Sequence, residues 1–145
     1  MGQAVELETS IGYLLKEASS VLHTAMDSVL RPLELTITQY ACLELLAQRP
    51  GLSSSDLARG AFVSRQSMNV LLQQMAKDGL VSRADQAPVG RVLPTQITDL
   101  GRERLADASA AVAAVESRMT GALPAGDRAE LRRLLRECVA ALADG

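Results

Sequence analysis

The segment from Ser64 to Lys77 holds the side chains whose types and spacing are best suited to recognise another molecule. Close to its start lie polar residues that can pair with base edges, namely Arg65, Gln66, Ser67 and Asn69. An arginine can donate two hydrogen bonds to guanine O6 and N7, and an asparagine or glutamine can pair with adenine. If the segment is a helix, Gln73 and Lys77 extend the same side by one and two turns. The pattern predicts a helix that contacts bases in the major groove of double-stranded DNA.

The neighbouring segments decide between this hypothesis and an ordinary solvated helix face, which has a similar composition. A short helix is predicted just before, where Ser53-Ser54-Ser55-Asp56 forms a capping pattern. Two strands are predicted just after, at 80–83 and 92–97, around a loop with proline and glycine. Helix, helix and β-hairpin is the order of a winged helix-turn-helix, in which the second helix enters the major groove. We therefore favour the hypothesis that this helix contacts double-stranded DNA. The residues expected to contact its phosphate backbone are Ser54, Lys77 and Arg91.

Apolar side chains at steps of three and four predict amphipathic helices on both sides of this lobe. A first helix covers about 6–30 and ends at Arg31-Pro32, because proline disfavours a helical conformation in the residue before it. A second helix begins at a capping box formed by Thr36 and Gln39. Gly79 is expected to end the recognition helix in a left-handed conformation.

Two further helices follow the predicted hairpin. Thr98 is placed to cap a long helix that runs to about 121, and another begins after Pro124. The apolar residues of this last helix form one stripe, made of Leu131, Leu134, Leu135, Cys138, Val139 and Leu142. The predicted fold class is therefore mainly α with a small β-hairpin wing.

Composition and charge exclude several classes of protein. The 145 residues are 48% hydrophobic and 22% charged, which suits a folded chain of one domain or two small lobes. Three aromatic residues, Tyr13, Tyr40 and Phe62, are too few for a platform that stacks single-stranded bases. The net charge of −2 indicates no global attraction to nucleic acid. However, residues 51–104 hold 7 basic and 5 acidic groups, whereas both flanking segments are acidic overall.

The remaining reactive residues predict no catalytic, cofactor or metal site. No motif of a nucleotide-binding, hydrolytic or metalloprotease site occurs, so we do not expect an enzyme. His23 is the only histidine, and Cys42 and Cys138 lie far apart without a CxxC motif. Both cysteines are interpreted as small buried hydrophobic residues rather than redox switches. Neither a secretory signal nor an apolar run of membrane-spanning length is found, so a cytoplasmic location is expected.

In five segments the sequence resembles the MarR family of transcriptional regulators; these are 35–43, 55–58, 63–67, 75–83 and 93–101. The resemblance implies a homodimer, in which residues 1–35 and 98–145 form a helical dimerisation region and 36–97 form the winged helix-turn-helix lobe. It also implies a repressor of a pseudo-palindromic operator, released by a small phenolic or lipophilic ligand. The residues that it places near the ligand cleft are Tyr13, His23 and Tyr40. For His23, an exposed or interface histidine is the alternative.

The chain departs from the family pattern at several positions. The family's wing usually carries an acidic residue and two consecutive arginines, whereas this chain has Asp85, Val89-Gly90 and Arg91. Val70 stands where the recognition helix commonly has a basic residue, and Pro94 lies within a predicted strand. A winged-helix module that binds another protein, without specific DNA binding, is the alternative function, because the fold does not dictate its partner.

Overall fold

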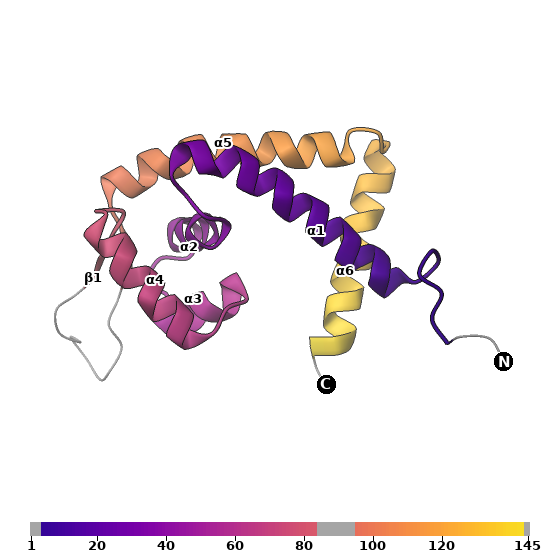
Figure 1. The fold of residues 1–145 in the computed structure, drawn as a ribbon, viewed down its shortest axis with the longest axis horizontal. Coiled ribbons are helices and arrows are strands. Elements are labelled where there is room, and N and C mark those ends of the chain that lie inside the picture. The colour runs from indigo at the N-terminus through magenta and orange to yellow at the C-terminus, as the bar shows by residue number, and fades with distance from the viewer. Residues whose placement is uncertain (1–3, 84–94, 144–145) are drawn as a thin grey trace. The chain divides into compact units, whose positions relative to one another are not determined.

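The computed structural model describes residues 4–83 and 95–143. The described elements follow the predicted order (Figure 1). They are α1 (Ile11–Leu30), a short 3-10 helix η1 (Arg31–Leu33), α2 (Ile37–Gln48), α3 (Ser54–Ala61), α4 (Arg65–Lys77), β1 (Val81–Arg83), β2 (Thr95–Ile97), α5 (Asp99–Thr120) and α6 (Ala125–Ala143). The mainly α fold with a small β-hairpin is confirmed.

Side-chain caps begin α2, α3 and α4 where the sequence predicts them. At α2, the Gln39 backbone N–H donates to the Thr36 hydroxyl at 3.1 Å, and the Gln39 side chain accepts from the Thr36 N–H at 2.9 Å. Ser53 and Ser64 cap α3 and α4 in the same β-region conformation. The predicted start of α1 near residue 6 is wrong, because Ser10 is the residue that caps it.

Two of the left-handed residues at helix ends, Gly79 and Phe62, differ in type. Gly79 has a φ of +80° after α4, as predicted, and glycine adopts this conformation without steric cost. Phe62 ends α3 with a φ of +61°, a conformation that a bulky side chain rarely adopts, and its side chain is 93% exposed. The turn between α3 and α4 is therefore tight, and it presents an aromatic ring to solvent.

One hydrophobic core holds the helix-turn-helix in place. Its fully buried large side chains are Leu30, Leu43, Leu57, Met68, Leu72 and Met75. They come from α1, α2, α3 and α4, and Leu105 and Ala108 of α5 join the same cluster. Burial of a leucine or methionine side chain stabilises a fold by about 1.5–3 kcal/mol, so this cluster fixes the inward face of α4 and leaves its other face to solvent.

The wing begins and ends in an antiparallel pair of short strands. Val81 pairs with Ile97, Ser82 with Gln96 and Arg83 with Thr95. Residues 84–94 lie outside the described residues, and with them the predicted positions of Asp85, Arg91 and Pro94.

The chain divides into two compact units, Met1–Val112 and Ala113–Gly145. In the second unit, the apolar stripe of α6 is exposed; Leu142, for example, is 83% accessible to solvent. Cys138 is also exposed, so its interpretation as a buried residue is wrong for the single chain, whereas Cys42 is buried as expected. The division into a dimerisation region and a winged lobe stays a prediction.

Candidate nucleic-acid interface

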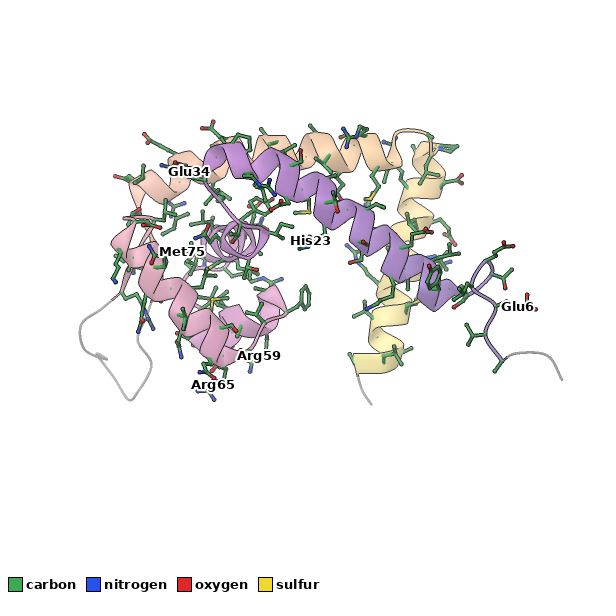
Figure 2. All side chains as sticks on the ribbon, in the orientation of Figure 1. Glu6, His23, Glu34, Arg59, Arg65 and Met75 are labelled. Atoms are coloured by element: carbon green, nitrogen blue, oxygen red, sulfur yellow. The ribbon has the colours of Figure 1, made fainter. Side chains whose placement is uncertain are left out.

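The start of α4 is held by its serine cap. The Ser67 backbone N–H donates to the Ser64 hydroxyl at 3.0 Å, and that hydroxyl donates to the Ser67 hydroxyl at 2.9 Å. The predicted base contact at Ser67 is therefore also part of the cap. Arg65, the first residue of the helix, is exposed and projects outward from its start (Figure 2).

The solvent face of α4 brings most of the predicted DNA-binding residues together. Met68, Leu72 and Met75 are buried on one side of the helix. The exposed residues include Gln66, Asn69, Gln73 and Lys77, together with Val70, which was not among the predicted contacts. No acidic residue occurs within α4, and its two charged residues are the basic Arg65 and Lys77. The face can therefore approach an anionic backbone without charge repulsion.

Ser54 lies at the start of α3 and is linked to the wing. The Arg83 guanidinium donates a hydrogen bond of 3.2 Å to its hydroxyl, so the end of β1 is tied to the first residue of α3. Arg83 Nε is buried and has no hydrogen-bond partner among the described residues. Arg83 lies in one of the segments that resemble the MarR family, but its contact to Ser54, 29 residues away in the chain, has no local sequence signal.

The carboxylate of Asp56 helps to cap the start of α3. Its carboxylate accepts a hydrogen bond of 3.2 Å from the Ser53 N–H, and it pairs with Arg59. The hydrogen bonds with Ser53, and then the charge of Arg59, lower the pKa of Asp56. The capping carboxylate is therefore ionised at neutral pH, next to the positive end of the helix dipole.

The three residues predicted near a ligand cleft occupy different positions. Tyr13 lines a shallow groove of about 420 Å³ with Leu7 and Leu14. His23 is exposed on α1 and projects from that helix (Figure 2). Tyr40 is partly buried on α2. The part of the chain that the structure describes does not bring these three side chains into one pocket.

Tyr40 belongs to a polar cluster around Glu44. Its hydroxyl donates to the Glu44 carboxylate, which also accepts from the hydroxyl of Ser109 and the amide of Gln48, each at 3.2 Å. Ser109 comes from α5, so the cluster joins α2 to α5 by hydrogen bonds across 65 residues of sequence. Sequence reasoning missed Glu44 and Ser109, since each is an unremarkable polar residue of a helix.

Among the described residues, the Cys42 thiol is a titratable group that lies away from the solvent face of α4. Burial raises the pKa of the Cys42 thiol from its ordinary value to about 12. Over residues 4–83 and 95–143, no group of three or more histidine, cysteine or acidic side chains is arranged to hold a metal ion. Over the same residues, none of the helices combines the length and the hydropathy of a membrane-spanning segment.

Comparison with known proteins identifies the family. The model of the MarR family matches residues 33–92. The HTH-type transcriptional repressor Rv2887 of Mycobacterium tuberculosis is 38% identical over 130 residues, which cover 90% of this chain and 94% of that repressor. The crystal structure of Rv2887 in complex with DNA has a TM-score of 0.73 and 35% identity, and the match covers 90% of this chain and 98% of that one.

A second structure of Rv2887 contains salicylic acid. It has a TM-score of 0.73 and 38% identity, over 90% of this chain and 96% of that one. This chain and Rv2887 therefore match in both sequence and fold over most of their lengths, and the helix-turn-helix lies within the matched part. The chain belongs to the MarR family of winged helix-turn-helix transcriptional regulators.

Proposed function

We propose that this protein is a homodimeric repressor that binds a pseudo-palindromic double-stranded DNA operator and is released by a small-molecule effector. The observation that carries the proposal is the solvent face of α4. It is mostly polar and free of acidic residues, and it faces solvent because Met68, Leu72 and Met75 are buried on the opposite side of the helix. In this function the protein acts on cytoplasmic DNA and catalyses no reaction.

The proposed contacts fall into two classes. Base edges are contacted by Arg65, Gln66, Ser67, Asn69 and Gln73, because their side chains have the donors and acceptors that major-groove recognition needs. The phosphate backbone is contacted by Ser54, Lys77 and Arg91. These contacts supply affinity without sequence information.

The proposed dimerisation region consists of residues 1–35 and 98–145. The exposed apolar stripe of α6 supports this, since monomeric proteins rarely leave a continuous apolar surface in water. Two copies then present two α4 helices to half-sites separated by about one turn of DNA.

The proposed effector is a small phenolic or lipophilic molecule, and a phenolic acid is the class favoured here. The relative Rv2887 has been crystallised with salicylic acid, which supports this class of ligand. Tyr13, His23 and Tyr40 remain the residues proposed to border its site. Added to a preformed complex with DNA, salicylate is expected to release the protein. Cyclohexanecarboxylate, which has a carboxylate but no aromatic ring, is expected to release it less effectively.

The proposal is tested by selecting bound duplexes from a randomised pool and measuring affinity by fluorescence anisotropy. Arg65→Ala is expected to weaken binding by about 1–3 kcal/mol and to relax preference at one position in each half-site. The matched control is Arg118→Ala, which removes an exposed arginine on α5. It is expected to leave the base preference unchanged.

Two results contradict these assignments. If Arg65→Ala weakens binding equally on all sequences, Arg65 contacts phosphate and not a base. If the natural protein selects no duplex even at low salt, where phosphate contacts are strongest, DNA is not the partner. The protein-interaction alternative then replaces the proposal.

A further inference from the structure

Val70 is an apolar residue in the middle of the polar face of α4. Its side chain is 63% exposed. Gln66 lies four residues before it and Gln73 three residues after it, so the three side chains share one side of the helix. The residues that fix the helix in the core, Met68, Leu72 and Met75, lie on the other side.

Nothing in the packing of α4 requires valine at this position. A valine is a poorer helix former than the alanine, glutamine or lysine found elsewhere in this helix. Among the described residues, Val70 belongs neither to the buried core cluster nor to the partly buried apolar side chains packed against it. Its presence therefore favours a role in contacting a partner rather than in folding.

The spacing of Val70 matches a known geometry of helix docking. In homeodomains, the helix in the major groove contacts DNA through residues at positions i, i+3, i+4 and i+7. In α4 the same spacing is occupied by Gln66, Asn69, Val70 and Gln73. The helix therefore offers three amide side chains that hydrogen-bond and one aliphatic side chain that cannot.

A major groove has one apolar group for such a side chain. The C5-methyl of thymine projects into the groove, and aliphatic side chains recognise it by contact. Cytosine and both purines have no such methyl group. A basic side chain at this position would instead favour guanine or a phosphate.

We propose that Val70 determines specificity by contacting the methyl group of one thymine in each half-site of the operator. The inference rests on the proposed DNA-binding function and adds a base identity to it. It assigns to Val70 a direct contact with the base, beside the hydrogen bonds of Gln66 and Asn69.

The experiment removes the methyl group without changing any hydrogen bond. In the best duplex selected by the natural protein, each thymine in turn is replaced by deoxyuridine, and affinity is measured by anisotropy. At one position per half-site, loss of the methyl group is expected to weaken binding about four-fold. This corresponds to the free energy of about 0.8 kcal/mol for burying one carbon. Uracil at the other thymines serves as the internal control.

Variants then assign the effect to Val70. Val70→Ala deletes both γ-methyl groups, and with it the penalty at the sensitive position is expected to fall below about 1.5-fold. Val70→Thr keeps one γ-methyl and is expected to show an intermediate penalty. Gln74→Ala changes an exposed residue of the same helix that is not among the proposed contacts, and it is expected to keep the full penalty. Circular dichroism checks that each variant is folded.

Three outcomes separate this inference from the function on which it rests. If no thymine position is sensitive to uracil, or if Val70→Ala keeps the full penalty, the inference is wrong although the protein binds DNA. If the natural protein selects no duplex, the proposed function itself fails. If the penalty is lost in Val70→Ala and kept in Gln74→Ala, the contact is supported.

Discussion

The Cys42 side chain shows how burial alone sets the chemistry of a residue. It lies fully buried on α2, and burial raises the pKa of its thiol to about 12. The thiolate is the form that attacks disulfides and oxidants, so this thiol is unreactive near neutral pH. The raised pKa also stabilises the folded chain at pH values below 9, the ordinary pKa of a thiol. That stabilisation is lost as the pH rises through about 12.

The reactivity of Cys42 is tested in the variant Cys138→Ser, in which it is the only thiol. We expect no reaction of the native variant with a disulfide reagent at pH 8, followed by complete reaction of one thiol once the chain is unfolded. Absorbance of the released thiolate measures both. Rapid modification of the folded variant would show that the residue is accessible, and would reopen a redox role for α2.

At the scale of elements, hydrogen bonds of Thr98 hold the junction between β2 and α5. The Thr98 backbone N–H donates to the Leu80 carbonyl at 3.1 Å, and the Thr98 hydroxyl accepts from the Gly101 N–H at 3.0 Å. This hydroxyl also donates to the Gly79 carbonyl. The first turn of α5 is thereby bound to the end of α4 and the start of β1.

Gly101 permits this close approach, because a Cβ atom there would lie 2.2 Å from the Leu80 carbonyl oxygen. Since that oxygen belongs to the backbone, Gly101→Ala is expected to lower the free energy of unfolding by about 1–3 kcal/mol. Denaturant unfolding followed by circular dichroism measures it. The control is Gly126→Ala on α6, where a Cβ meets nothing within 4 Å. A helical alanine is there expected to stabilise the chain by up to about 1 kcal/mol. Equal effects of the two substitutions would contradict the close contact.

At the scale of the whole molecule, the exposed stripe of α6 is the feature that a single chain leaves unexplained. The second compact unit, Ala113–Gly145, also contains a groove of about 490 Å³ lined in part by Met119, Leu131 and Leu135. Apolar side chains exposed at helical spacing are typical of a surface that another helix covers. Under the proposed function, a second copy of the chain covers it.

Leu142→Glu tests this surface, because Leu142 is exposed in the single chain and its replacement should not unfold α6. In a symmetric dimer the charge enters the interface twice, so we expect the dimer dissociation constant to rise by about 100-fold or more. Sedimentation equilibrium measures it. Arg136→Gln, which changes the net charge of the same helix by the same amount, is the control. A dimer unaffected by Leu142→Glu would remove this part of α6 from the proposed interface.

The sequence by itself determined most of the described elements of this protein and which face of α4 is exposed to solvent. Serine and threonine caps, Arg31-Pro32 and Gly79 act through hydrogen bonds and backbone sterics within a few residues, so their effects are visible locally. The apolar period of α4 separates its buried and exposed residues for the same reason.

Only the tertiary structure decided which distant groups meet and which apolar residues stay exposed. The links from Arg83 to Ser54 and from Ser109 to Glu44 join residues far apart in sequence, so no local pattern encodes them. The stripe of α6 predicts burial, but the hydrophobic period does not say whether the covering surface belongs to the same chain. Cys138 is therefore exposed here, whereas Cys42, with an equally apolar setting in the sequence, is buried in the core.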